Sequence, residues 1–191
     1  ALDAVELMSM GFDKLREHLR PTYRAHRTIT FGGIQPNIIP DKGQIWWFVR
    51  DASMPAAKST YDKLLKIAEG AALMTGTTYD VQYAASAWPQ LASKTIAEAI
   101  QKNIDTVGMP KWTADDQAFA KSVQVAQKFK LQPLATEVAP LSTPDSRGVS
   151  MGGGSDDIGD VMWTVPTITI RYPSNIPNAI GHNVTSAMAM A

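Results

Sequence analysis

The sequence predicts a mixed α/β chain that opens with an α+β domain, and three patterns lead to this prediction. Apolar residues recur every three or four positions from Leu2 to Leu19, which is typical of an amphipathic helix. Residues 23–31 and 43–52 alternate in polarity and are rich in β-branched and aromatic side chains, which indicates two strands. A second helix at about 55–75 and a third strand at 77–86 complete a ferredoxin-like domain that lacks its first strand.

Proline and glycine mark the limits of these elements. Pro21 ends the first helix, Pro55 suits the first turn of the second, and Gly76 is well placed to end it. Alternation along the second strand divides its side chains between the two faces of a sheet. One face carries Ile45, Trp47 and Val49, and the other carries Trp46, Phe48 and Arg50.

From Trp88 onward the pattern changes, so we expect one domain over residues 1–87 and a second over residues 88–191. The second part shows two helical patterns, at about 90–103 and 113–129. A proline-bearing loop is expected at 132–150 and a strand at 164–172. The first residues lie directly in a helical repeat and the last are small and apolar. We therefore expect the chain to be a piece of a longer protein, incomplete in both domains.

The composition excludes several classes of partner. The 191 residues are 45% hydrophobic and carry a net charge of zero, whereas nucleic acids and anionic membranes select a basic excess. No apolar run approaches the roughly 18 residues of a membrane span. Cysteine is absent, so any metal would be held by His, Asp or Glu. The absence of cysteine leaves the compartment open, and we expect a cytoplasmic protein.

Three residues around the two strands are candidates for a binding or catalytic site. His26 lies in the middle of the first strand, Asn37 in the loop that follows it, and Arg50 at the end of the second strand. An amide and a guanidinium fork suit a carboxylate, because the guanidinium offers two parallel N–H donors. Taken singly, each residue is more often an exposed, capping or core-edge residue than part of a site.

A glycine-rich stretch, "GGGSDDIGDVMW", begins at Gly152. Successive glycine amides and the Ser155 hydroxyl can face an anion, although the same letters also suit a linker. The abrupt entry into hydrophobic residues favours a site. The spacing of Asp156, Asp157 and Asp160 does not match a calcium loop, so we expect these side chains to cap and shape the stretch. His182, after a glycine, is more typical of a loop residue than of a ligand.

The chain resembles the M20 family of metallopeptidases and amidohydrolases in four stretches taken in order. They are "ALDAVELMSMGFDKLREHL", "RAHRTITFGGIQPNIIPDKGQIWWFVR", "IAEGAALMTGTT" and "GGGSDDIGDVMWTVPTITI". The closest likeness is to the amidohydrolase branch that cleaves an amide next to a carboxylate-bearing group, as in p-aminobenzoyl-glutamate. The resemblance covers nearly the whole chain and is loose over residues 104–148.

The resemblance implies a lid domain inserted into a zinc-peptidase-like α/β catalytic domain with two zinc ions. Residues 1–87 resemble the lid, through which the family's enzymes form a homodimer, and residues 88–191 resemble the return into the catalytic domain. The family's general base and most of its metal ligands precede the part that this chain matches. The chain alone is therefore expected to be inactive.

The resemblance also implies roles for particular residues. His26 resembles the lid histidine that reaches across the dimer to the scissile carbonyl and stabilises the oxyanion. The implied substrate-binding residues are Asn37, Arg50, Gly153, Gly154 and Ser155, and the implied metal ligand is His182. Two alternative functions remain. The chain is either part of a zinc-dependent amidohydrolase or a dimerisation and binding module with no activity of its own.

Overall fold

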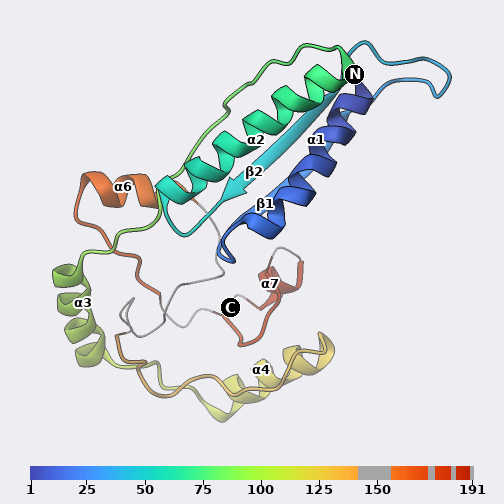
Figure 1. Cartoon of the computed structure of the whole chain (residues 1–191). Helices are drawn as coiled ribbons and strands as arrows, with labels where there is room; N and C mark the ends of the chain where they lie inside the picture. Colours follow the sequence, from blue (N-terminus) through green and yellow to red (C-terminus); the bar gives the residue numbers. More distant parts are fainter. Residues whose placement is uncertain (142–155, 172–174, 182–183, 190–191) are drawn as a thin grey trace. The chain divides into compact units, whose positions relative to one another are not determined.

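A computed structural model describes residues 1–141, 156–171, 175–181 and 184–189. The chain divides into two compact units, Ala1–Gln90 with Arg147–Asp160, and Leu91–Ser146 with Val161–Ala191 (Figure 1). The elements in chain order are α1 (Leu2–Leu15), the 3₁₀ turn η1 (Arg16–His18), β1 (Arg24–Phe31), β2 (Gln44–Arg50), α2 (Met54–Thr75), α3 (Lys94–Val107), α4 (Ala114–Ala126), α6 (Ile158–Thr164) and α7 (Val184–Met188).

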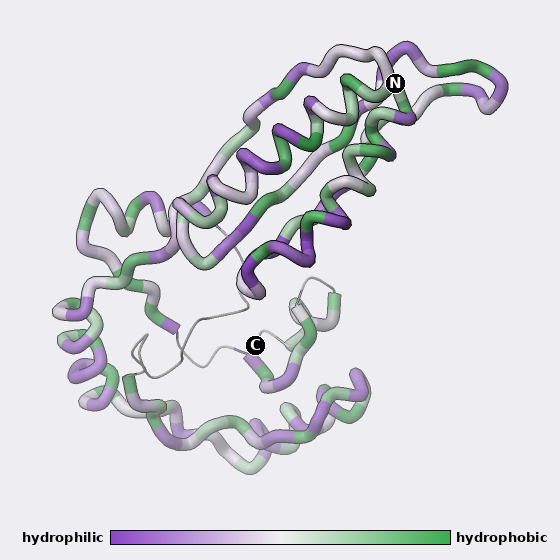
Figure 2. Tube along the Cα trace, in the orientation of Figure 1, coloured by the Kyte–Doolittle hydropathy of each residue, from purple (hydrophilic) through white to green (hydrophobic). Residues whose placement is uncertain are grey.

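In the first unit, α1 and α2 cover one face of an antiparallel β1–β2 hairpin (Figure 1). The core lies between the helices and this face, where the Phe12 ring lies 4.9 Å from the Trp47 ring. Gly11 allows the helices to approach closely, because a Cβ at this position would lie 2.8 Å from Ile67 Cγ2. Figure 2 shows the hydropathy behind this packing, with hydrophobic and hydrophilic residues following one another along both helices.

The register of the hairpin places its side chains on two distinct faces. Ala25 pairs with Val49, Arg27 with Trp47, and Ile29 with Ile45 on the helix-covered face. Between them, three further pairs lie on the opposite face: Arg24 with Arg50, His26 with Phe48, and Thr28 with Trp46. The predicted division of the 43–52 strand between two faces is therefore confirmed.

Helix α2 has the limits that its sequence predicts. Ser53 Oγ accepts a hydrogen bond from the Ala56 amide at 3.4 Å, and Pro55 lies in the first turn. Gly76 takes a left-handed conformation with φ 63°, and the Thr77 amide donates to the Ala72 carbonyl at 3.0 Å. This is the Schellman arrangement, which requires a residue that tolerates positive φ.

The second unit is built around a small cluster of Ala120, Ile176 and Ala189. Helix α4 begins at a capping box, in which the Thr113 side chain accepts from the Asp116 amide and Asp116 accepts from the Thr113 amide. These hydrogen bonds from Thr113 lower the pKa of the Asp116 carboxyl. The buried Gln124 side chain donates to the Gln132 and Pro177 carbonyls and accepts from the Gln132 amide.

The structure confirms the mixed α/β class, with an α+β hairpin unit in the order helix–strand–strand–helix. The strand predicted over 77–86 is wrong, because this segment is extended but pairs with no strand in the described part of the chain. A ring contact joins its Tyr83 to Tyr61 of α2, at 5.9 Å. Alternating side chains favour a strand, but a ladder also needs a neighbouring edge with which to pair.

The strand predicted over 164–172 is also wrong over its described residues. Residues 158–164 form α6 instead, and 165–171 have no strand pairing. Met162 of α6 is buried whereas Trp163 is half exposed, and both of these hydrophobic residues after the glycines belong to a helix.

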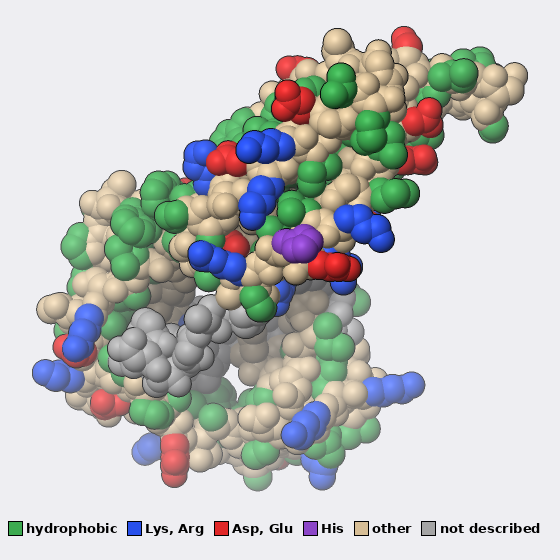
Figure 3. Space-filling view, in the orientation of Figure 1, with side chains coloured by type: hydrophobic (Ala, Val, Ile, Leu, Met, Phe, Trp, Pro, Cys, Tyr) green, Lys and Arg blue, Asp and Glu red, His purple; other side chains and the backbone are tan. Residues whose placement is uncertain are grey.

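Among the described helices, none is long and apolar enough to cross a membrane. Cationic and anionic side chains intersperse on the face seen in Figure 3.

Candidate functional site

The candidate site is the face of the hairpin that α1 and α2 leave uncovered, which we call the open face. Its members are Arg24, His26, Thr28, Trp46, Phe48 and Arg50. All six are exposed, and neither strand contains an acidic residue. The open face therefore combines aromatic rings, cationic groups and an imidazole on one rigid surface.

His26 lies at the centre of the open face. Its register partner is Phe48, and its neighbours two positions away along β1 are Arg24 and Thr28. Opposite residues of an antiparallel pair have Cβ atoms roughly 5 Å apart, so the imidazole and the Phe48 ring are immediate neighbours. The exposed imidazole is accessible to a ligand that lies along the hairpin.

Two arginines lie at one end of the open face, where Arg24 pairs with Arg50. The Arg50 guanidinium carbon lies 5.5 Å from the centre of the Phe48 ring, which is cation–π distance. Arg24 Nη1 donates to the carbonyls of Pro21 at 3.0 Å and Tyr23 at 2.7 Å, which holds its side chain against the preceding turn. The structure thus brings His26 and Arg50, two of the predicted site residues, onto one surface.

Asn37 does not join them. It lies in the turn of the loop 32–43, where the Ile38 amide donates to the Gln35 carbonyl at 3.1 Å. This loop connects the end of β1 to the start of β2, and it projects away from the hairpin in Figure 1. Arg24 and Arg50 lie at the opposite end of the strands, so this chain does not place Asn37 and Arg50 around one carboxylate.

The covered face holds a third arginine in a structural role. Arg27 donates two hydrogen bonds to the Asp13 carboxylate, at 2.8 and 2.7 Å, and its guanidinium lies 5.3 Å from the Trp47 ring centre. The hydrogen bond from Arg27 lowers the pKa of the Asp13 carboxyl, and the same bond raises the pKa of Arg27. Arg27 is therefore neutralised by an acidic partner on the covered face.

The glycine-rich stretch lies partly within the described ranges. Gly153, Gly154 and Ser155 lie outside the described residues, as does His182. Asp156 Oδ1 accepts from the Ile158 amide at 3.2 Å at the start of α6, and Asp160 Oδ1 accepts from the Trp88 amide at 2.9 Å. The expected capping role is confirmed for Asp156, whereas Asp160 lies within α6 and binds a backbone amide distant in sequence.

Metal ligands do not gather in the described ranges. Within them, no group of three or more His, Asp, Glu or Cys side chains is placed to hold a metal ion. The described residues therefore do not form the zinc site that the resemblance implies, and we derive no chemical step through zinc.

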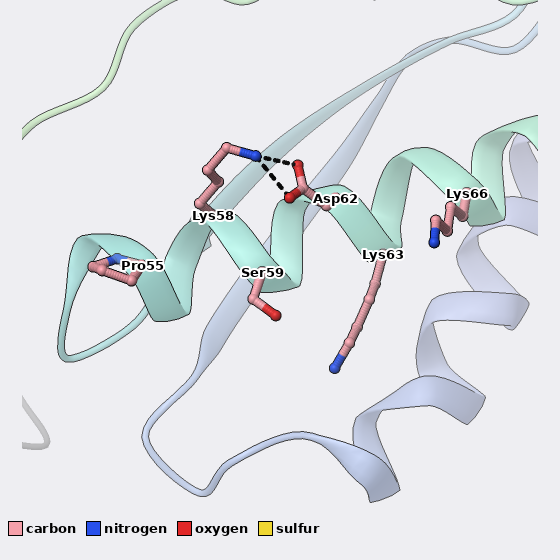
Figure 4. Close-up of a pocket in the computed structure, with 6 residues that line it drawn as sticks. All are labelled: Pro55, Lys58, Ser59, Asp62, Lys63 and Lys66. Carbon is pink, nitrogen blue, oxygen red and sulfur yellow. Dashed lines mark hydrogen bonds and ion pairs between the residues drawn. The ribbon is translucent and has the colours of Figure 1, made fainter.

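A shallow depression on the outer side of α2 is a further concave feature. It is lined by Pro55, Lys58, Ser59, Asp62, Lys63 and Lys66 (Figure 4). Lys58 donates to both oxygens of Asp62, at 2.9 and 2.7 Å, one helical turn away. An ion pair of this kind is typical of a solvated helix surface, and we assign it no role.

Known proteins similar to this chain are hydrolases. The chain is 32% identical to a subunit of the p-aminobenzoyl-glutamate hydrolase of Escherichia coli (strain K12), over 91% of this chain and 40% of that protein. It is 34% identical to Xaa-Arg dipeptidase of Mus musculus, over 88% of this chain and 32% of that protein. This chain is a relative of these hydrolases. The resemblance predicted from the sequence is confirmed.

The similarity covers only part of each relative. Xaa-Arg dipeptidase of Homo sapiens is 30% identical over 57% of the chain. The chain spans less than half of the length of each of these three relatives. No protein-family model matches the sequence.

Sequence reasoning missed the aromatic part of the open face. Alternation predicts Trp46 and Phe48 on the same face as Arg50 but gives them no role. Their rings lie 5.1 Å apart, and they are 55% and 49% exposed. The signal in the sequence is that Trp46, Phe48 and Arg50 occupy alternate positions of one strand, which places them on one face. The residues of β1 that pair with them depend on the strand register, which the sequence alone does not specify.

Proposed function

We propose that this chain is part of an amidohydrolase of the M20 type, which cleaves an amide bond next to a carboxylate-bearing group. The whole enzyme would act on a substrate that resembles p-aminobenzoyl-glutamate. The observation that carries the proposal is the open face, where an exposed imidazole and the Arg50 guanidinium share one surface without an acidic neighbour in either strand. The similarity to enzymes named as hydrolases supports the same interpretation.

His26 would act on the carbonyl oxygen of the scissile amide. When water adds to the carbonyl carbon, the oxygen becomes an oxyanion, and an imidazole N–H can donate a hydrogen bond to it. The C–N bond then breaks, and the amine leaves with a proton. Arg50 would hold the substrate carboxylate, since its guanidinium can donate two parallel hydrogen bonds.

Zinc is part of the proposal as the metal of the whole enzyme. Its ligands would come from residues beyond those described here, with His182 as a candidate. Two zinc ions would supply Lewis-acid polarisation of the amide. The homodimer through residues 1–87 is likewise proposed, and it would carry His26 to the catalytic domain of the partner subunit.

The test uses the longer protein that contains this chain. We expect hydrolysis of p-aminobenzoyl-glutamate, loss of the activity with a chelator, and recovery with zinc. Equal rates with and without metal would contradict the zinc-dependent interpretation. A longer protein that forms dimers but cleaves neither this substrate nor a dipeptide would favour the dimerisation and binding module instead.

His26→Ala gives the sharper test of the site. We expect kcat to fall by roughly 10²- to 10³-fold, the scale of losing one oxyanion donor. His18→Ala is the matched control, because His18 is exposed on η1 and outside the open face. An unchanged kcat in His26→Ala, with the control also unchanged, would remove His26 from the mechanism.

A further inference from the structure

Charged side chains of the first unit are sorted along the hairpin, although both signs intersperse over the molecule as a whole. The end at which Arg24 pairs with Arg50 adjoins the turn that follows α1, because Arg24 Nη1 donates to the Pro21 carbonyl at 3.0 Å. We call this region the basic end. Its exposed cations are Lys14, Arg16, Arg20, Arg24 and Arg50.

Several acidic side chains lie toward the other end of the same unit. Asp3 and Glu6 belong to the first two turns of α1, and Asp41 lies in the loop 32–43. The Ala1 amine donates to the Pro40 carbonyl at 3.0 Å, which places the start of α1 beside this loop. A helix rises about 1.5 Å per residue, so roughly 17 Å of helix axis separates Asp3 from the cations at the end of α1.

The carboxylate of Asp13 is too little to neutralise the cations around it. Arg27 of the covered face donates two hydrogen bonds to it, at 2.8 and 2.7 Å. The pKa of Asp13 is lowered first by this hydrogen bond and further by the charges of Arg16 and Lys14. One carboxylate therefore faces three cations, and its oxygens are already occupied by Arg27.

The other two carboxylates at this end leave an excess of positive charge. Asp51 Oδ1 accepts from Thr22 Oγ1 at 2.6 Å and from the Ala52 amide at 2.7 Å. Glu17 lies exposed on η1. Among the described residues, neither Asp51 nor Glu17 forms an ion pair with a cation of the basic end.

The dipole of α1 explains only part of this sorting. Asp3 in the first turn and Lys14 in the last turn suit the positive and negative ends of the helix. Arg20, Arg24 and Arg50 lie in the turn and in the strands, where the dipole of α1 does not account for them. The positive charge therefore continues from the end of α1 to the part of the open face that holds Arg50.

A surface with an excess of one charge attracts ligands of the opposite charge at long range. The attraction raises the local concentration of the ligand, and it weakens as ionic strength rises. At 0.05 M salt the screening length is about 14 Å, so exposed cations that do not touch a ligand still act on it. A dianion gains about twice as much as a monoanion from each cation.

We propose that the basic end is an electrostatic capture surface for small dicarboxylates, in which Lys14, Arg16 and Arg20 concentrate a dianion around Arg50. This inference rests on the proposed function, to which it adds a second source of affinity for an acidic substrate. One carboxylate is bound at short range by Arg50. The second is held by the field of the other cations and makes no specific contact.

The first experiment measures binding without turnover. Glutarate, a dicarboxylate that has no amide bond, is titrated into this chain while NMR follows the backbone amides of residues 14–24 and 50. We expect shifts at these amides and an affinity that falls about 3- to 10-fold between 0.05 and 0.5 M salt. Acetate, a monoanion, should bind more weakly and depend less on salt.

Charge variants test the origin of the affinity. Arg16→Gln combined with Arg20→Gln should weaken glutarate binding about 2- to 4-fold at 0.05 M salt and very little at 0.5 M. Arg16→Lys combined with Arg20→Lys keeps both charges and should retain the affinity, because a field does not require the guanidinium fork. Lys42→Gln combined with Lys66→Gln is the control, since it removes the same charge outside the basic end.

Several outcomes would overturn the capture surface. They are absence of shifts with glutarate, an affinity independent of salt, and an unchanged affinity in the double glutamine variant. An equal loss in the Lys42 and Lys66 control would assign the attraction to net charge and would overturn it as well. Thermal unfolding of each variant identifies loss of folding.

The proposed function fails or stands separately. Salt-dependent binding of glutarate, combined with no amide hydrolysis by the longer protein, would keep the capture surface and remove the proposed function. Amide hydrolysis by the longer protein, combined with no salt-dependent binding, would keep the proposed function and remove the capture surface.

Discussion

The Arg50 side chain stacks on an aromatic ring and can bind a carboxylate at the same time. Its guanidinium lies 5.5 Å from the Phe48 ring, and its register partner is Arg24. Arg24 Nη1 donates to the Pro21 and Tyr23 carbonyls, whereas the Arg50 guanidinium stacks on the Phe48 ring, and a guanidinium in this position can also bind a carboxylate.

Arg50→Lys should therefore affect binding more than chemistry. A lysine keeps the charge but loses the planar fork and stacks less well on a ring. We expect KM for the carboxylate substrate to rise by roughly tenfold, about the effect of one charge-assisted hydrogen bond, with kcat nearly unchanged. Steady-state kinetics of the longer protein measures both. Normal binding combined with a lower melting temperature would instead make Arg50 a structural residue.

The Asp13–Arg27 pair predicts a pH dependence of stability. Its hydrogen bond lowers the pKa of Asp13 in the folded state below the unfolded value. The pair therefore stabilises the fold above the unfolded pKa, near 4, and the contribution is lost as the pH falls through the folded pKa. Both side chains are partly exposed, so we expect less than about 1 kcal/mol.

Urea unfolding of the chain between pH 7 and pH 2.5 tests this prediction. Asp13→Asn should lower the free energy of unfolding at pH 7 and have little effect at pH 2.5. Asp3→Asn is a suitable control, since Asp3 is exposed in the first turn of the same helix. An Asp13→Asn effect of equal size at both pH values would contradict the ion-pair origin.

At the scale of elements, helix α2 owes its end to backbone conformation. Gly76 adopts φ 63°, and a Cβ there would meet nothing within 4 Å. Gly70 lies within the same helix, and a Cβ there would also meet nothing within 4 Å. Neither position is crowded, so the comparison of the two glycines depends mainly on their backbone conformations.

Gly76→Ala and Gly70→Ala should have opposite effects. Alanine at Gly76 must adopt the left-handed conformation, and we expect the free energy of unfolding to fall by roughly 1 kcal/mol. Alanine at Gly70 improves helix propensity, and we expect a gain of about 0.5–1 kcal/mol. Denaturant titration followed by circular dichroism measures both. Equal signs for the two variants would contradict this account of the helix end.

Across the whole molecule, segments distant in sequence are joined by side-chain amides. Gln124 is 1% exposed. Its side-chain amide forms hydrogen bonds with the backbone of Gln132 and with the carbonyl of Pro177, which is 53 residues away in the sequence. Gln117 similarly donates to the Leu134 carbonyl at 3.2 Å and accepts from the Leu134 amide at 2.9 Å. The loop after α4 is thus held to the helix without forming a strand.

Gln124→Ala should destabilise the second unit. It removes three hydrogen bonds and leaves backbone groups to be satisfied by water, so we expect a loss of about 1–3 kcal/mol. Lys121→Ala, on the exposed side of the same helix, is the control and should change stability little. Hydrogen exchange of the Gln132 and Leu134 amides locates the effect. Unchanged protection at these amides would contradict the proposed hydrogen-bond network.

The sequence by itself determined the elements whose signals are local. Helical periodicity, Pro55 and Gly76 predicted α1 and α2 with nearly the observed limits, and alternation placed Trp46 with Arg50, because these signals depend on neighbouring residues only. The tertiary structure alone decided that 77–86 pairs with no strand among the described residues, that His26 faces Phe48, and that Asn37 lies at the far end of the hairpin. Pairing requires a partner distant in sequence, and local preference does not specify which edge is available.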